Sequence, residues 1–238
     1  MTMVWLYPKH LNLYGDRGNI ECLKRRLEWR GLQYKLVEFN VGDSLKKLTG
    51  ADLFFAGGGP DSLQREVSAD AFRLKPALIK AQEQGRAGLF ICGFYQLLGR
   101  FYRPAEGADI PGLGIFDCYT EHFGARRKRC VGNIVTTPLI PLNPLTPLVG
   151  FENHEGRTYL CPTAKPLAKV QRGFGNNGQD KTEGIIKGNF VGTYLHGPLL
   201  PKNPHLADWL LAKALGEKLP FLDDKLEWQT HTNALKLK

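Results

Sequence analysis

The segment LFICGFYQ, residues 89–96, constrains the fold of this chain more than any other. An apolar run too short for a helix ends at Cys92, and Gly93 and a helix-like segment follow it. A strand ending in such a sharp turn holds its last side chain at the rim of a sheet, where the next helix N-terminus favours a thiolate. The backbone N–H of Gly93 is placed to meet an oxyanion. Cys92 is therefore a candidate nucleophile, although the pattern also suits a small apolar side chain buried in a strand.

Short apolar segments alternate with helical patterns in the first half of the chain. Strands are predicted at residues 3–7, 34–39, 53–56 and 88–92, and helices at residues 19–29 and 71–84. Alternating strands and helices with right-handed crossovers form a parallel sheet covered by helices on both faces. We therefore predict a three-layer α/β fold with a mostly parallel, flavodoxin-like sheet.

The second half changes character, because short strands are separated by glycine, asparagine and proline residues. Strands are predicted at residues 131–136, 158–160, 169–171, 184–187 and 190–194, as antiparallel additions to the same sheet. A last helix is predicted over residues 204–215, with Asn203 as its N-cap and Pro204 at its first position. We expect one domain over residues 1–215 and a polar, frayed tail over residues 216–238.

Two turns should lie at one rim of the predicted sheet, where open parallel sheets bind their ligands. The triplet Gly57-Gly58-Gly59 and the pair Cys92-Gly93 each follow a predicted strand. A glycine triplet leaves backbone N–H groups uncovered, so it suits the second half of an oxyanion hole facing Cys92 as well as a simple tight turn. A phosphate loop is disfavoured because no G-K-[ST] motif follows.

The composition is that of an ordinary soluble globular protein. The 238 residues are 42% hydrophobic and 23% charged, with no apolar run of membrane-spanning length and no signal-peptide pattern at the N-terminus. The five cysteines are scattered without a C-x-x-C pair, which argues against a disulfide framework and a zinc site. We therefore expect a cytoplasmic location and no membrane insertion.

The net charge of +9 is densest at residues 126–129, RRKR. A basic patch can attract nucleic acid, anionic lipid or an acidic partner. Stacking aromatic residues are not interleaved with this cluster at the spacing of a nucleic-acid-binding module. We therefore expect no nucleic-acid partner, and the cluster suits a solvated loop.

A catalytic thiol needs a base, and two of the six histidines are candidates. His154 lies in the segment 150–158, and His196 ends a predicted strand between turn-forming residues. A strand-end histidine on a rim loop is well placed to face Cys92. A single histidine at a strand end is as often a hydrogen-bonded structural residue, so spacing alone does not decide its role.

These motifs together resemble the class I (triad) glutamine amidotransferases, in which a cysteine at a strand-to-helix elbow is followed by a glutamine, here Gln96, and much later by a histidine. Segments 92–99 and 192–200 are similar to the cobyric-acid-synthase-like branch of that family. Segments 11–19, 150–160, 173–178 and 202–204 resemble its GatD-type members, the free-standing glutaminase subunits of lipid II isoglutaminyl synthase.

The resemblance implies a mechanism in which Cys92 attacks the side-chain carboxamide of L-glutamine. His196 would activate the thiol and then protonate the departing ammonia, and water would hydrolyse the glutamyl thioester. The N–H of Gly93 and the loop containing Gly58 and Gly59 would hold the oxyanion. The resemblance further implies that Arg129 binds the α-carboxylate of glutamine, although it is also one more charge in a basic cluster.

The resemblance also implies a heterodimer with a Mur-ligase-like synthetase subunit. That partner would use ATP and Mg²⁺ to activate the α-carboxyl of D-glutamate in lipid II, and ammonia from this chain would convert it to D-isoglutamine for peptidoglycan. No cofactor or metal is expected in this chain. Two alternatives stay open, a glutaminase for cobyrinate-type amidation and a non-catalytic scaffold subunit. A hydrolase of the Gly-x-nucleophile-x-Gly type is disfavoured because positions 90 and 94 are not glycine.

The sequence departs from the family pattern at three positions. Pro198 stands where a glutamate usually orients the histidine, so we expect that acid to come from the partner, with Glu152 and Glu183 as substitutes within this chain. Phe94 replaces the second glycine of the elbow and would narrow the glutamine pocket if its ring pointed inward. Pro60 replaces a usual glutamine, which removes one potential substrate contact.

The motif at residues 11–19 contains Tyr14, Asp16 and Arg17. The sequence assigns these three residues only a structural or interface role. A local ion pair between Asp16 and Arg17 at a turn is an equally simple interpretation.

Overall fold

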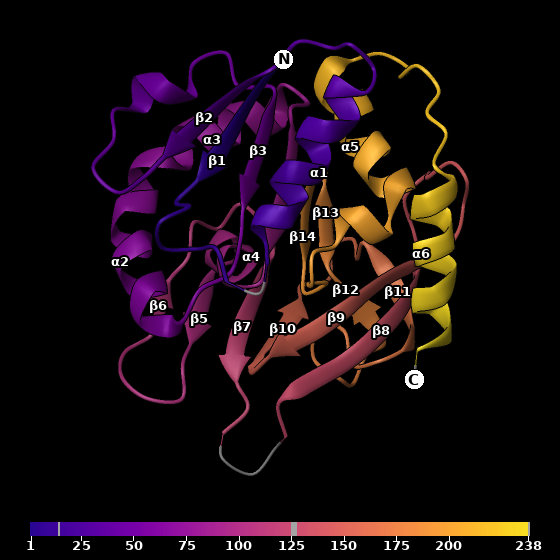
Figure 1. Ribbon diagram of the computed structural model, residues 1–238. Coiled ribbons are helices and arrows are strands. Elements are labelled where there is room, and N and C mark those ends of the chain that lie inside the picture. The colour runs from indigo at the N-terminus through magenta and orange to yellow at the C-terminus, as the bar shows by residue number, and fades with distance from the viewer. Residues whose placement is uncertain (14, 125–127, 238) are drawn as a thin grey trace.

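The computed structural model describes residues 1–13, 15–124 and 128–237, and it contains a central sheet of six strands (Figure 1). The strand order is β13-β14-β4-β3-β1-β2, in which β13 is antiparallel to β14 and all other neighbours are parallel. The bounds are β1 (Thr2–Leu6), β2 (Lys35–Phe39), β3 (Leu53–Ala56), β4 (Ala87–Ile91), β13 (Ile185–Lys187) and β14 (Phe190–Thr193). The predicted mostly parallel α/β sheet is thus confirmed.

The two central strands explain why the sheet forms where it does. Every residue of β3 and of β4 is buried, as their uninterrupted apolar sequences predict for parallel strands covered on both faces. Register pairs Phe55 with Leu89 and Ala56 with Phe90, so the glycine triplet and Cys92 leave the sheet side by side. On the other side of β4, Thr193 pairs with Ile91, which brings the end of β14 to the same place.

Helices cover both faces of the sheet, with α1 in front of the strands and α3 behind them in Figure 1. Helix α1 packs against α5, which also contacts β3 and β4. The buried residues Ile20, Leu23 and Leu27 form the predicted apolar face of α1. The helices are α1 (Arg17–Glu28), α2 (Asp61–Ala71), α3 (Lys75–Glu83), α4 (Gly93–Leu98), α5 (Pro204–Leu215) and α6 (Lys225–Lys236), with short 3₁₀ helices η1 (Leu45–Leu48), η2 (Phe72–Leu74) and η3 (Leu200–Lys202). None of the helices in the described ranges is long and apolar enough to cross a membrane.

Helix α2 is missing from the sequence prediction, which places one helix over residues 71–84. In the structure, α2 precedes that segment, which begins with η2 and continues as α3. The sequence of α2, DSLQREVSADA, is mostly polar, and only Gln64, Val67, Ser68 and Ala71 are buried. Its weak apolar periodicity explains the omission, and the helix proves important because its first turn reaches the site.

The predicted addition of all later strands to one sheet is wrong. Only β13 and β14 join the central sheet, and the others form two separate four-stranded sheets beyond the carboxyl ends of the parallel strands (Figure 1). The long antiparallel ribbon of β8 and β9 satisfies its own hydrogen bonds, so it does not need the edge of the central sheet. The orders are β10-β7-β5-β6 and β12-β11-β8-β9, with β5 (Phe101–Arg103), β6 (Ile110–Pro111), β7 (Cys118–His122), β8 (Cys130–Pro138), β9 (Leu148–His154), β10 (Gly156–Leu160), β11 (Ala168–Arg172) and β12 (Thr182–Glu183).

The C-terminal segment differs from the frayed tail expected from its polar sequence. It contains α6, and His231 of that helix is buried. The imidazole Nδ1 of His231 lies 2.7 Å from the carbonyl oxygen of Lys202, and its ring packs edge-on against His205 of α5. These few contacts anchor a helix whose other residues are mostly exposed, which is why composition alone does not reveal it.

Candidate active site

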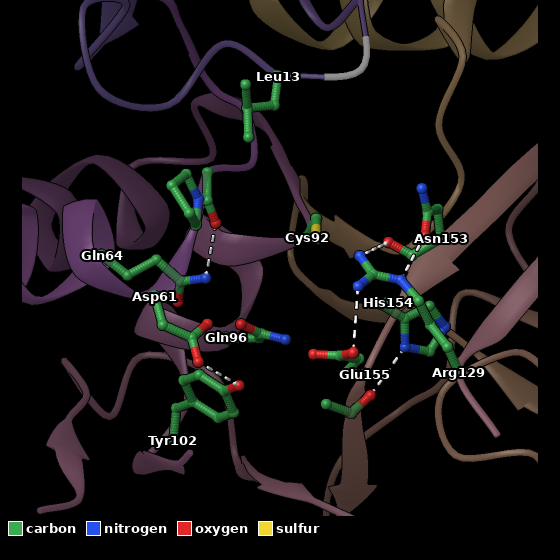
Figure 2. Close-up of a pocket in the computed structure, with 13 residues that line it drawn as sticks. Leu13, Asp61, Gln64, Cys92, Gln96, Tyr102, Arg129, Asn153, His154 and Glu155 are labelled. Atoms are coloured by element: carbon green, nitrogen blue, oxygen red, sulfur yellow. Dashed lines mark hydrogen bonds and ion pairs between the residues drawn. The ribbon is translucent and has the colours of Figure 1, made fainter. Parts of the chain in front are cut away.

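Cys92 lies at a strained elbow between β4 and α4. Its backbone has φ +52° and ψ −107°, a conformation that a non-glycine residue adopts only when its surroundings enforce it. The backbone N–H of Cys92 donates to the carbonyl of Thr193 at 3.0 Å, and its carbonyl accepts from Gln96 at 3.0 Å. The side chain is 8% exposed and opens into a cavity (Figure 2). This is the sharp turn that the sequence pattern predicts.

His196 follows β14 and is held in place by its backbone. Its N–H donates to the carbonyl of Phe151 at 2.8 Å, and its carbonyl accepts from the N–H of Phe151 at 3.2 Å. Burial opposes a charged imidazolium, but the adjacent Cys92 sulfur and Asp16 carboxylate together raise the pKa of His196 to about 10. The structure therefore brings Cys92 and His196 together, with the histidine favoured in its protonated form.

Asp16 supplies a carboxylate beside His196 from within the chain. Its side chain is fully buried, and its Oδ1 lies 3.6 Å from Nδ1 of His196. Its Oδ2 accepts a hydrogen bond of 2.7 Å from the backbone N–H of Gly58. This arrangement differs from our expectation of an acid from a partner subunit. Local sequence patterns do not reveal this contact, because Asp16 and His196 lie far apart in the chain.

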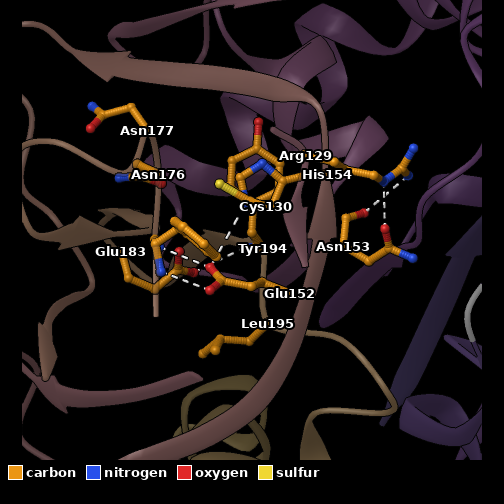
Figure 3. A network of polar contacts seen from close by, with 12 residues as sticks. Arg129, Cys130, Glu152, Asn153, His154, Asn176, Asn177, Glu183, Tyr194 and Leu195 are labelled. Atoms are coloured by element: carbon orange, nitrogen blue, oxygen red, sulfur yellow. Dashed lines mark hydrogen bonds and ion pairs between the residues drawn. The ribbon is translucent and has the colours of Figure 1, made fainter. Parts of the chain in front are cut away.

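The two glutamates expected as substitutes have other contacts (Figure 3). Glu152 and Glu183 are both fully buried, and burial raises the pKa of each to about 7. Their hydrogen-bond donors are the backbone N–H groups of Phe174 and Gly175 for Glu152, and the Thr193 hydroxyl and the Tyr194 backbone N–H for Glu183. Glu183 thus fixes the end of β14 just before His196, and Glu152 fixes a neighbouring loop.

Pro198 packs against the first turn of helix α1, which begins directly after Asp16. A Cβ atom added at Gly18 would lie only 2.5 Å from Cγ of Pro198. Pro198, which stands where the family usually has an orienting glutamate, therefore contacts the segment that carries Asp16. Arg17, next to Asp16, is exposed and lies 3.7 Å from Glu21, so the proposed local pair of Asp16 with Arg17 is wrong.

The glycine triplet after β3 lies against the thiol. A Cβ atom added at Gly58 would lie 3.0 Å from Cβ and 3.4 Å from Sγ of Cys92. One at Gly57 would lie 2.5 Å from Oδ2 of Asp16. An added methyl group would therefore force a shift at Gly57 and would make a tight contact with Cys92 at Gly58. The N–H of Gly58 is directed at Asp16, not at an oxyanion, which leaves Gly59 and Gly93 as the candidate oxyanion donors.

A cavity of about 230 Å³, the Cys92 cavity, lies in front of the thiol (Figure 2). Arg129 lines it, with Nε donating to Oδ1 of Asn153 at 2.5 Å and Nη1 at 3.2 Å from Oε1 of Glu155. The structure therefore places the predicted carboxylate-binding arginine and the predicted nucleophile in one cavity. The polar side chains that line it are Asp61, Gln64, Gln96, Tyr102, Arg129, Asn153, His154 and Glu155.

Phe94 does not narrow this cavity, contrary to the possibility considered from the sequence. It lies within α4 and is fully buried. Its ring packs 5.7 Å from Phe90 and 6.0 Å from Tyr7, between ring centroids. Pro60 lines the cavity and precedes α2 as its N-cap residue.

His154, the second candidate base, has the contacts of a neutral structural residue. Its Nδ1 lies 2.7 Å from the carbonyl oxygen of Gly156, and its ring stacks on Tyr194 at 3.7 Å. Burial lowers the pKa of His154 to about 3. Across residues 1–13, 15–124 and 128–237, no group of three or more His, Cys, Asp or Glu residues is arranged to hold a metal ion. Tyr14, Arg126 and Arg127 lie outside the described residues.

Known proteins identify the family to which this site belongs. Residues 2–204 match the CobB/CobQ-like glutamine amidotransferase domain. The chain belongs to this family. Within the CobB/CobQ-like family, it is 41% identical over 234 residues to the GatD subunit of the lipid II isoglutaminyl synthase (glutamine-hydrolyzing) of Staphylococcus aureus, covering 96% of this chain and 92% of the relative. The corresponding Streptococcus pneumoniae subunit is 35% identical, over 92% of this chain and 82% of the relative.

The fold agrees with this assignment. The structure of PurLQS from Thermotoga maritima matches with a TM-score of 0.60 and 15% identity, over 99% of this chain and 98% of that one. As a CobB/CobQ-like amidotransferase, the chain is an enzyme of the glutamine amidotransferase class. Sequence reasoning missed Asp16 and Gln64 as site residues. The first lies in a motif whose role it left open, and the second on the unpredicted helix α2.

Proposed function

We propose that this chain hydrolyses L-glutamine through a Cys92 thioester and supplies ammonia to a synthetase subunit that amidates lipid II. The observation that carries the proposal is the strained elbow that presents Cys92 to His196, with Asp16 behind the histidine. The lipid II assignment is supported by the two GatD subunits, which resemble this chain over most of their length.

The first step forms a bond between the Cys92 sulfur and the side-chain carbonyl carbon of glutamine. The thiol proton passes to His196, whose raised pKa favours the imidazolium. The C–N bond then breaks, and the imidazolium donates its proton to the departing nitrogen, which leaves as ammonia. Water activated by the neutral histidine hydrolyses the thioester and releases glutamate.

The carbonyl oxygen gains negative charge during each attack and needs fixed donors. The N–H groups of Gly93 and Gly59 meet this need, because the loop of Gly58 lies against the Cys92 side chain. Asp16 acts as a positioning residue: one oxygen faces His196 and the other holds the Gly58 N–H. A single buried carboxylate thereby fixes the base relative to the oxyanion loop.

Arg129 binds the α-carboxylate of glutamine. A guanidinium offers a carboxylate two parallel hydrogen bonds, and its position in the Cys92 cavity is fixed by Asn153 and Glu155. The arginine and the thiol thus contact opposite ends of one amino-acid substrate.

The partner is a Mur-ligase-like synthetase that forms a heterodimer with this chain in the cytoplasm. It holds ATP and Mg²⁺ and activates the α-carboxyl of D-glutamate in lipid II. This division of labour agrees with the sequence of this chain, in which no G-K-[ST] motif follows the glycine triplet. Ammonia from glutamine then gives D-isoglutamine in the peptidoglycan precursor.

The test measures ammonia released from L-glutamine by the purified chain, alone and with the synthetase subunit, and the amidation of lipid II by the complex. We expect glutamine-dependent amidation that Cys92→Ala abolishes, while added ammonium salt restores amidation by that variant. Amidation from glutamine that survives Cys92→Ala would contradict the proposal. A Cys161→Ala variant is the matched control, since Cys161 is a free thiol outside the cavity.

A further inference from the structure

Gln64 lines the Cys92 cavity and carries a buried hydrogen-bond acceptor without a partner in the part of the chain that the structure describes. Its side chain is 3% exposed, and its Nε2 donates to the carbonyl oxygen of Gly59 at 3.0 Å. Its Oε1 is buried and has no hydrogen-bond partner among the described residues. A buried acceptor without a donor is costly, so such an atom in a binding cavity indicates that a ligand supplies the donor.

The orientation of the Gln64 amide follows from its partner. A carbonyl oxygen only accepts hydrogen bonds, so the end of the amide that faces Gly59 must be the NH₂ group. The opposite end is therefore the oxygen. Figure 2 shows the Gln64 side chain entering the cavity from α2, on the side opposite Arg129.

Gln64 also lies directly over the oxyanion donor. A Cβ atom added at Gly93 would lie 2.9 Å from Nε2 and 3.0 Å from Cδ of Gln64. The amide of Gln64 thus contacts Gly93 by packing and Gly59 by a hydrogen bond, and these are the two residues assigned above as oxyanion donors. Any substrate group held near Gln64 is consequently next to the bond that breaks.

We propose that Oε1 of Gln64 accepts an N–H of the substrate's side-chain carboxamide and makes the site specific for amides. The inference rests on the proposed glutaminase function. In a carboxamide the oxygen and nitrogen share one carbon, so a substrate whose oxygen meets Gly93 places its NH₂ beside Gln64. Holding one N–H there turns the nitrogen lone pair toward His196. That lone pair takes the imidazolium proton when the C–N bond breaks and ammonia leaves.

Other acceptors in the cavity are less suited to this task. Oδ2 of Asp61 already accepts from the Tyr102 hydroxyl at 3.1 Å. Gln96 also has a buried Oε1 without a hydrogen-bond partner among the described residues, but its Nε2 donates to the Tyr194 hydroxyl at 3.0 Å and adjoins Gly156, where an added Cβ would lie 2.6 Å from Nε2. Gln64 differs from both groups because its amide packs against Gly93 and donates to the carbonyl oxygen of Gly59.

The test compares two substrates that differ only in the leaving group, L-glutamine and L-glutamate γ-methyl ester, with the complex of this chain and its synthetase subunit. Gln64→Met keeps the approximate size and removes the acceptor. We expect kcat/KM for glutamine to fall about tenfold or more, while kcat/KM for the ester stays near the wild-type value. Arg65→Ala, an exposed change on the same helix, is the control and should alter neither value.

Each other outcome overturns the inference. An equal fall for both substrates would show that Gln64 only positions the loop or binds the amino-acid end, and no change for either would show that it contacts nothing that reacts. Gln64→Glu keeps an oxygen acceptor but loses the donor to Gly59. This variant therefore tests the role of the acceptor even if the methionine variant fails to fold. We expect it to retain a preference for the amide, and loss of that preference would refute the role of the acceptor. A wild-type complex that hydrolyses neither substrate would refute the proposed glutaminase function itself.

Discussion

Oδ1 of Asp16 lies 3.6 Å from Nδ1 of His196, and the other oxygen of the same carboxylate accepts the N–H of Gly58. The 3.6 Å separation exceeds an ordinary hydrogen bond, but catalytic contacts often tighten when substrate binds. The loop after β1 and the loop after β14 meet here, so the acid and the base reach one point from distant parts of the chain.

Replacing Asp16 should weaken the base without removing it. We expect Asp16→Asn to lower kcat/KM for glutamine about 10- to 100-fold, because the neutral amide no longer stabilises the imidazolium. The same change should lower the pKa of His196, which the carboxylate helps to raise, and an NMR pH titration of the imidazole measures it. Arg17→Ala is the adjacent control. Full activity of Asp16→Asn in the complex would show that a partner supplies the orienting acid.

Gly57→Ala should lower kcat/KM for glutamine in part as Asp16→Asn does. The added methyl would lie 2.5 Å from Oδ2 of Asp16 and 2.8 Å from the carbonyl oxygen of Leu11, so the loop must shift. We expect a loss of about 1–3 kcal/mol in the free energy of unfolding, as for other overpacked sites, together with lower kcat/KM. In the double variant with Asp16→Asn the losses in kcat/KM should not add, since both act through one carboxylate. Additive losses would contradict this coupling.

Arg129 should affect binding more than chemistry. We expect Arg129→Ala to raise KM for glutamine about 10- to 100-fold with a smaller change in kcat, because the α-carboxylate contact is present in both ground and transition states. Arg129→Lys should recover only part of the loss, since an ammonium lacks the bidentate fork. Lys128→Ala is the neighbouring control. An unchanged KM in Arg129→Ala would assign the arginine to the surface cluster.

Glu183 should make stability depend on pH in a defined window. Burial raises its folded-state pKa to about 7, so the unfolded chain ionises first as pH rises above its ordinary value of 4.5. The folded state binds more protons between these values, and stability is therefore lost as pH increases through about 7. Glu183→Gln keeps an acceptor for Thr193 and Tyr194 and should reduce this loss by an amount on the order of 3 kcal/mol. Denaturant unfolding from pH 5 to pH 8 measures it, and identical slopes in both proteins would contradict the assignment.

Local sequence patterns were sufficient to predict structural features that lie within one short segment. The apolar run ending in Cys92-Gly93 specifies a buried strand and a sharp turn, and β14, which is shortly followed by His196, pairs with that strand in register. The position of Asp16 could not be predicted because it depends on how the loop before α1 folds over the triplet after β3. Helix α2 was not predicted because its apolar face is short, and Gln64 of this helix was therefore not recognised as a site residue.

The pairing of the strands in the second half of the chain also could not be predicted from the sequence. Alternating residues and turns revealed most of these strands, yet the same pattern suits addition to the central sheet or a separate ribbon. The choice depends on pairing partners such as β8 with β9, which lie across a loop from each other. That ribbon places Arg129 and Asn153 opposite the thiol, so part of the cavity follows from tertiary pairing.

The central claim, that Cys92 is a nucleophile activated within this chain, is tested most directly with the glutamine analogue 6-diazo-5-oxo-L-norleucine. The wild-type chain, Asp16→Asn and His196→Ala are incubated with it, alone and with the synthetase subunit, and the adduct is located by mass spectrometry. The account predicts a single adduct on Cys92 in the isolated wild-type chain, formed more slowly in Asp16→Asn and slowest in His196→Ala. Absence of an adduct on Cys92 in the isolated chain would contradict activation within this chain, and absence in the complex as well would contradict the nucleophile itself.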